Sequence, residues 1–156
     1  RIDLEDLALY ANWPLERVRR ADIERDIEAG RAILECYRLF PQDVFIIASQ
    51  SGVNAAIVEV ARQVKERGHA LVAVTSLDHT QHVQSRHPSG EKLYELADIV
   101  IDNCGPYGDA LLNLPTGGNV CAVSSLSTML IAEMLTAETI HALLERGVEP
   151  LVYVSA

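Results

Sequence analysis

Apolar residues fall into short continuous runs that alternate with longer amphipathic segments. Residues 44–48 (VFIIA) and 70–75 (ALVAVT) are almost wholly apolar and too short for helices, which predicts two buried strands. Between them, apolar residues recur at intervals of three and four from Ile57 to Val64, and basic residues then precede Gly68. This pattern is typical of a helix that ends at that glycine. A strand, a helix and a strand at such short spacing predict a right-handed parallel crossover.

The remaining segments continue the alternation of strands and helices. Pro14 favours the start of an amphipathic helix that runs from Leu15 toward Arg38. The pattern further predicts a short helix at 92–97, a third strand at 98–102, a loop at 105–118 with room for a hairpin, a fourth strand at 119–123, an apolar helix at 124–135, a helix from Thr136 to Gly147, and a last strand at 151–155.

These elements predict an α/β fold of the doubly wound, flavodoxin type, with a mostly parallel sheet flanked by helices in three layers. We expect a single domain overall, with an incomplete N-terminal helical segment at 1–40 ahead of a core at 41–156. In such sheets, ligands bind at the carboxyl ends of the strands. The loop after residue 48, the pair Thr75–Ser76 and the loop 103–108 all follow strands, so we expect them to converge at one edge.

The acidic balance of the chain limits its partners. A net charge of −9 over 156 residues argues against a nucleic-acid surface, which needs a basic face. No apolar run approaches the roughly 20 residues that a membrane span needs, and no signal-peptide pattern opens the chain. The three cysteines are odd in number and widely spaced, so we expect reduced thiols in a cytoplasmic protein. We expect no bound metal and no cofactor.

A hydroxyl-rich turn joins the strand at 44–48 to the helix that follows it. Its residues are Ser49, Gln50, Ser51 and Gly52, with Asn54 two positions later. The first turn of a helix has backbone N–H groups without intrahelical partners and a partial positive charge, so it binds anions without a basic side chain. The sequence therefore predicts an anion site at this turn. The alternative is that Ser51 or Asn54 simply caps the helix.

The strand, the SQSG turn and the helix together resemble the SIS (sugar isomerase) domain, in which a Ser-x-Ser-Gly loop grips the phosphate of a phosphosugar. The segments RHPSG, KLYELADIVIDN and GPYGDA, between Arg86 and Ala110, are similar to bacterial phosphosugar-binding SIS proteins. The resemblance spans roughly residues 43–156. It implies an SIS-like fold that binds a phosphorylated sugar or amino sugar, with the phosphate held by Ser49, Gln50, Ser51 and Asn54.

Hydroxyl residues at the start of the helix at 124–135 extend the predicted site. SIS domains often have hydroxyls at such a helix start, so the resemblance implies that Ser124, Ser125 and Thr128 line the other side of the sugar phosphate. The alternative is helix capping and the packing of small residues at an interface. The same helix is apolar nearly all round, and we expect it to be buried between the sheet and another subunit of a homodimer or larger assembly.

Glu133 and His87 are the candidate catalytic residues. Glu133 falls on an apolar face of the helix at 124–135, and burial adapts a carboxylate to act as a general base. The alternative is that Glu133 pairs with a basic residue across a subunit contact. His87 could act as a general acid because histidine changes charge near neutral pH, and Arg86 could bind a phosphate bidentately. The alternative for both is a place on the surface of an ordinary Pro-Ser-Gly turn.

The resemblance implies an aldose–ketose isomerase or a related phosphosugar lyase or etherase, and two other functions stay open. One is a non-catalytic phosphosugar sensor, and the other is a purely structural interaction domain. An SIS domain usually begins with a strand that ends in a Gly-x-Gly-x-Ser turn, but Gly30 is the single glycine that precedes Ser49. The chain also opens with Arg1 rather than Met. Whether a native N-terminal strand precedes this sequence is therefore an open question at this point.

Overall fold

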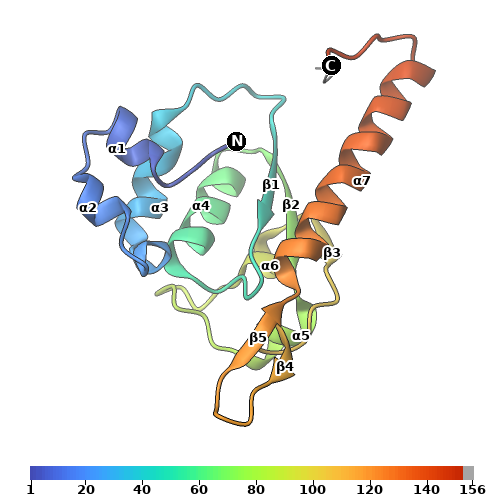
Figure 1. Ribbon diagram of the computed structural model, residues 1–156. Coiled ribbons are helices and arrows are strands. Elements are labelled where there is room, and N and C mark those ends of the chain that lie inside the picture. Colours follow the sequence, from blue (N-terminus) through green and yellow to red (C-terminus); the bar gives the residue numbers. More distant parts are fainter. Residues whose placement is uncertain (153–156) are drawn as a thin grey trace.

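The computed structural model describes residues 1–152 and shows a mixed α/β fold (Figure 1). Its elements are α1 (Asp6–Tyr10), α2 (Leu15–Val18), η1 (Ile23–Arg25), α3 (Ile27–Ile33), η2 (Leu34–Cys36), β1 (Val44–Ala48), α4 (Ala55–Glu66), β2 (Ala70–Thr75), α5 (Leu77–His82), α6 (Leu93–Leu96), β3 (Ile99–Asp102), β4 (Ala110–Asn113), β5 (Asn119–Ala122) and α7 (Ser124–Glu145). The first three strands form one parallel sheet in the order β1–β2–β3. Ile46 lies opposite Val72, which lies opposite Ile99. The predicted α/β fold with a parallel sheet flanked by helices is confirmed.

One face of the sheet carries the hydrophobic core. Phe45, Leu71 and Ala73 are buried on this face in a cluster that also holds residues of α3 and α4. Figure 1 shows both helices on the same side of the sheet, with α4 nearer to the strands. Because successive side chains of a strand point to opposite faces, Val44 and Ile46 project from the other face, where they are exposed.

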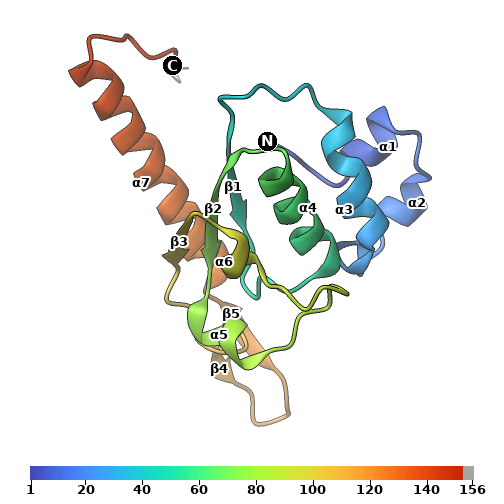
Figure 2. The same ribbon diagram turned by 180° about the vertical axis from the view of Figure 1, so that it is seen from behind.

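The second face of the sheet is only loosely covered. α7 runs beside this face, on the side opposite to α4 (Figures 1 and 2), and a hollow of about 600 Å³ separates the helix from the strands. The burial expected for the apolar side chains of α7 is not seen in the single chain, because several of them are exposed. These are Leu126, Met129, Leu130, Met134 and Leu144. Assembly with another subunit stays a prediction.

The single helix predicted from Leu15 toward Arg38 is wrong, because this stretch forms four short helices in succession. The break before α3 has a local cause. The Asp26 side chain accepts a hydrogen bond from the Glu28 N–H at 3.1 Å and so caps α3. Asp26 also pairs with Arg17 of α2 at 2.7 Å, which ties the two helices together across the break.

The strand predicted at 119–123 forms, but it does not belong to the parallel sheet. β5 pairs antiparallel with β4, with Leu112 opposite Val120, in a separate hairpin. Gly117 and Gly118 between the two strands both have φ +89°, a conformation that glycine adopts without strain. The hairpin considered for the loop at 105–118 is therefore observed, and its second strand is the predicted fourth strand.

The two helices predicted at 124–135 and from Thr136 to Gly147 are one continuous helix, α7. The Thr136 hydroxyl donates to the Ala132 carbonyl oxygen at 2.8 Å, one turn earlier. A hydroxyl that bonds back to its own helix does not cap a new one. The strand predicted at 151–155 lies mostly outside the described residues, and its first two positions are not in a strand. Over residues 1–152, no helix has the length and apolar character needed to cross a membrane.

Gly30 brings α3 into close contact with α4. A Cβ atom at this position would lie 2.5 Å from the Ala56 carbonyl oxygen and 2.8 Å from the Ala56 Cα atom, both of which belong to the backbone of α4. Backbone atoms inside a packed helix pair cannot move aside as the end of a flexible side chain can. The glycine in the middle of α3 is therefore required by packing.

We expect the substitution Gly30→Ala to lower the free energy of unfolding by about 1–3 kcal/mol, the usual cost of overpacking. Urea denaturation followed by circular dichroism measures this change. Helix propensity acts in the opposite direction, since alanine in a helix interior is about 1 kcal/mol more favourable than glycine. The sign of the change therefore decides the matter, and a more stable variant would contradict the close contact.

Candidate functional site

The carboxyl ends of the three parallel strands meet at Gln50, directly after β1. The Thr75 hydroxyl at the end of β2 donates to the Gln50 carbonyl oxygen at 3.1 Å. The Asn103 side chain, after β3, donates from Nδ2 to Gln50 Oε1 at 2.7 Å. The backbone N–H of Asn103 also donates to the Thr75 carbonyl oxygen at 3.0 Å. The strand ends that the sequence predicted to converge therefore do so, through hydrogen bonds.

Asn103 determines how the Gln50 amide is oriented. The Gly105 N–H donates to Asn103 Oδ1 at 2.9 Å, so Nδ2 of Asn103 is directed to Gln50, whose oxygen must accept. This leaves the Gln50 Nε2 group buried and without an acceptor among residues 1–152. Gly105 makes room for the amide, since a Cβ atom there would lie 2.6 Å from Gln50 Nε2. A buried donor without a partner is unusual and is available to a ligand or a water molecule.

The two serines of the turn between β1 and α4 differ in their hydrogen bonding. Ser49 Oγ accepts a hydrogen bond from the Gly52 N–H at 3.3 Å and so stabilises the turn. Gly52 has φ +60° and lies close to neighbouring elements, because a Cβ atom there would be 3.2 Å from Thr75 Oγ1. The Ser51 hydroxyl, by contrast, takes no part in the hydrogen bonds described for residues 1–152 and is half-buried. Ser51 is therefore the serine of the turn that is free to bind a ligand.

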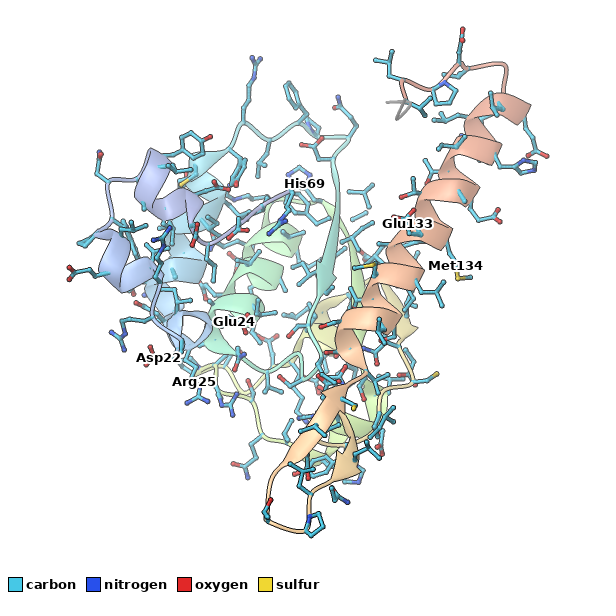
Figure 3. The ribbon with its side chains drawn as sticks, viewed as in Figure 1. Asp22, Glu24, Arg25, His69, Glu133 and Met134 are labelled. Atoms are coloured by element: carbon cyan, nitrogen blue, oxygen red, sulfur yellow. The ribbon has the colours of Figure 1, made fainter. Side chains whose placement is uncertain are left out.

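Asn54 occupies the N-cap position of α4, but its side chain does not cap the helix. Its Nδ2 group donates to Glu24 Oε2 at 2.7 Å, and its Oδ1 atom accepts from Arg86 Nη1 at 2.5 Å. Figure 3 shows Glu24 beside the start of α4. The capping alternative is therefore not observed for Asn54, and the first-turn amides of this 12-residue helix receive no side-chain cap within the described part of the chain.

The segment between α5 and α6 brings Arg86 to this helix start. The Arg86 N–H donates to the Val53 carbonyl oxygen at 2.9 Å, and the Leu93 N–H donates to the Gly52 carbonyl oxygen at 2.9 Å. The Arg86 side chain is exposed. A positive charge thus lies next to the uncapped end of α4, whose helix dipole has the same sign.

His87, the next residue, is buried and fully bonded. Its Nε2 atom lies 2.8 Å from Glu59 Oε2, and its Nδ1 atom accepts the Ser89 N–H at 3.1 Å. The nearby carboxylate of Glu91 has a pKa below its ordinary value, because of its hydrogen bond with the Ser89 side chain and its pairing with Arg62. The His87 side chain therefore contacts Glu59 in α4, whereas the side chain of Arg86 contacts Asn54 at the start of that helix. The role of His87 in proton transfer stays a prediction that this geometry does not support.

Of the residues predicted to line the other side of the sugar phosphate, Ser124, Ser125 and Thr128, only Thr128 lies near the turn. Thr128 lines the hollow between α7 and the sheet together with Ala48, which directly precedes Ser49. The Ser124 hydroxyl donates to Asp109 Oδ2 at 2.5 Å, and Ser125 is exposed. Neither serine has a described hydrogen bond to the 49–54 turn in residues 1–152. Their binding role stays a prediction.

Glu133 is exposed on α7 and is not among the residues that line the hollow beside the sheet. The burial from which a general-base role was inferred is therefore absent in the single chain.

His79 and His82 lie beside the ring of Tyr107. Their ring centroids are 5.2 and 5.9 Å, respectively, from the centroid of the Tyr107 ring. In residues 1–152 no group of three or more His, Cys, Asp or Glu side chains is arranged to hold a metal ion.

The sequence analysis did not identify two residues that contribute contacts to this region, Glu59 and Glu24. Glu59 stands among apolar residues on α4, a signal that a half-buried carboxylate needs a partner, but the sequence does not say that the partner is His87. Glu24 lies in η1, inside a stretch predicted as one long helix, and no pattern connects it to Asn54. Both contacts join segments about 30 positions apart in the chain.

We expect Asn103→Ala to lower the free energy of unfolding by about 1–3 kcal/mol, because it leaves Gln50 Oε1 and the Gly105 N–H without partners in a sheltered place. Asn113→Ala in the exposed β4 strand is the matched control and should change stability by less than about 0.5 kcal/mol. Thermal and urea unfolding of both variants provide the comparison. Equal effects of the two substitutions would contradict a special role for Asn103.

Comparison with known proteins finds a matching domain family and relatives of similar sequence. Residues 1–76 match the model of the SIS domain, a segment that begins before β1 and includes the 49–54 turn. A UPF0309 protein of Caldanaerobacter subterraneus subsp. tengcongensis is 45% identical over 135 residues, which cover 85% of this chain and 55% of that protein. A UPF0309 protein of Listeria monocytogenes serovar 1/2a is 43% identical over 117 residues, covering 74% of this chain and 50% of that protein.

A UPF0309 protein of Brucella ovis is 36% identical over 142 residues, which cover 89% of this chain and 56% of that protein. The chain thus spans about half the length of the curated relatives it matches. The SIS resemblance inferred from the turn is confirmed, although the matched segment runs over residues 1–76 and not over residues 43–156. On these matches, residues 1–76 are similar to the SIS domain, and the chain as a whole is similar to bacterial UPF0309 proteins.

Proposed function

We propose that the protein binds a phosphorylated sugar, with the phosphate at the turn of residues 49–54 and the first turn of α4. The observation that carries the proposal is the concentration of free donors at this place. The first-turn amides have no side-chain cap, the Ser51 hydroxyl is unengaged among residues 1–152, and the Arg86 guanidinium lies next to Asn54. Uncapped helix starts are well suited to phosphate groups.

The family supports the same ligand class, because SIS domains generally bind phosphosugars. The parts of the site also differ in role. Ser49, Gln50 and Asn103 stabilise the turn through hydrogen bonds inside the protein. Ser51, the amides of α4 and Arg86 contact the anion. Asn54 serves both, since it holds Arg86 and begins the helix.

Transformation of the sugar is a proposal about the whole protein, because the chain spans about half the length of its relatives. Isomerisation requires a group that moves a proton, but Glu133 is exposed and both ring nitrogens of His87 are bonded within the protein. The buried position of His87 favours a non-catalytic sensor as the second candidate function. Turnover of the best ligand, abolished by Glu133→Gln with binding retained, would support the isomerase. Binding without turnover would support the sensor.

We expect sugar phosphates to raise the midpoint of thermal unfolding, whereas the corresponding unphosphorylated sugars should not. A ligand at a hundred times its dissociation constant adds about 2.7 kcal/mol to the free energy of unfolding. Ser51→Ala should remove this shift and leave the midpoint of the ligand-free protein almost unchanged, because its hydroxyl has no described partner to lose.

Ser49→Ala and Thr139→Ala are the controls for this measurement. Ser49→Ala removes the acceptor of the Gly52 N–H and should lower the midpoint even without ligand. Thr139→Ala removes an exposed hydroxyl from the far part of α7 and should keep the ligand shift. If no sugar phosphate stabilises the protein, or if Ser51→Ala keeps the full shift, the turn is not a phosphosugar site.

A further inference from the structure

Hydrogen bonds at both ring nitrogens hold His87 in place. Its Nδ1 atom accepts the Ser89 N–H at 3.1 Å and lies 2.8 Å from Ser89 Oγ. Its Nε2 atom lies 2.8 Å from Glu59 Oε2. Both ring nitrogens are engaged, and the side chain is 6% exposed. His87 therefore links residues 83–91, the segment between α5 and α6 that carries Arg86, to α4.

Glu59 receives this link on a well-packed part of α4. Its side chain is 14% exposed, and its second oxygen, Oε1, lies 3.4 Å from Arg31 Nε on α3. The carboxylate thus joins α3, α4 and the 83–91 segment. Hydrogen bonds to a sheltered charged group are stronger than those between neutral groups at the surface. The charged groups around the pair are Arg31, Arg62 and Glu91, of which Arg62 pairs with Glu91.

The residue before His87 is the one that reaches the helix start. Arg86 is bound to the turn by its N–H, which donates to Val53, and by its guanidinium, which donates to Asn54 Oδ1. Its long side chain is exposed, and holding such a side chain in one place costs conformational entropy. The contact of His87 with Glu59 restricts the backbone of the adjacent Arg86 and so reduces the motion of the Arg86 side chain.

We propose that His87 is a positioning residue, and that its hydrogen bond to Glu59 holds Arg86 where the guanidinium contacts a bound phosphate. The proposal rests on the proposed function, since it assigns a role within that phosphate site. Arg86 supplies the positive charge by which the site binds phosphorylated sugars more tightly than neutral ones. The Glu59–His87 link makes this charge effective by keeping the 83–91 segment against α4.

Isothermal titration of the protein with inorganic phosphate and with glucosamine 6-phosphate tests the proposal. Arg86→Ala should weaken both ligands about tenfold or more, the effect of losing a hydrogen bond between charged groups. Glu59→Ala should weaken them by a similar factor, although Glu59 does not touch the ligand. The double variant should bind no more weakly than Arg86→Ala, because both substitutions remove the same contact.

Two further variants separate positioning from general damage to the fold. Glu59→Gln keeps an oxygen that accepts from His87 Nε2, so it should restore affinity close to that of the unmodified protein. Glu66→Ala removes a glutamate two turns farther along α4 that pairs at the surface with Arg62, and it should leave both affinities unchanged. If Glu59→Ala does not fold, His87→Phe keeps the ring volume without the two hydrogen bonds and carries the same comparison.

The outcomes separate this proposal from the one on which it rests. If the unmodified protein binds neither ligand, the phosphate site and the positioning role fail together. If the protein binds and Ser51→Ala abolishes binding, but Glu59→Ala and His87→Phe bind normally, the phosphate site stands and the positioning role is overturned. Additive losses in the Glu59→Ala, Arg86→Ala double variant would also overturn it, because independent effects indicate that the two residues do not act on the same contact.

Discussion

The candidate site depends on the side chain of Gln50 and its hydrogen bond with Asn103. Parallel strands end at one edge of a sheet, where their backbone groups lose regular partners and the chain leaves in different directions. Here one glutamine, directly after β1, accepts hydrogen bonds from the ends of the two other strands, β2 and β3. The turn after β1 is thereby held by the sheet, and the backbone and hydroxyl donors of the next residues remain available.

The same constraint explains why small residues stand at certain places. Gly52 and Gly105 lie where a Cβ atom would come within about 3.2 Å of polar atoms of the network, and Gly30 lies where α3 contacts the backbone of α4. In each case the glycine allows two segments to approach closely enough for hydrogen bonding or packing. A site of this kind needs a rigid support, because its donors must be in place before the anion arrives.

Part of this arrangement could be predicted from the sequence, and the limit has a physical origin. The strands β1 and β2 have the predicted bounds because buried parallel strands are continuous apolar runs. The break at Asp26 and the unbroken course through Thr136 were not predicted, because Asp and Thr residues can either cap a helix or lie inside one. The surroundings decide between the two positions. The burial of His87 depends on Glu59, 28 positions earlier, and no local pattern shows such a contact.

The acidic composition of the chain does not oppose an anion at this turn. A net charge of −9 describes the whole chain, whereas exposed charges more than about 8 Å apart are largely screened at physiological ionic strength. The carboxylates close to the start of α4 are engaged: Glu24 accepts from Asn54, and Glu59 accepts from His87 and pairs with Arg31. The local field is then set by the helix dipole and by Arg86, both of which are positive. In the proposed anion site, two carboxylates therefore act indirectly, by holding in place the groups that present its positive charge.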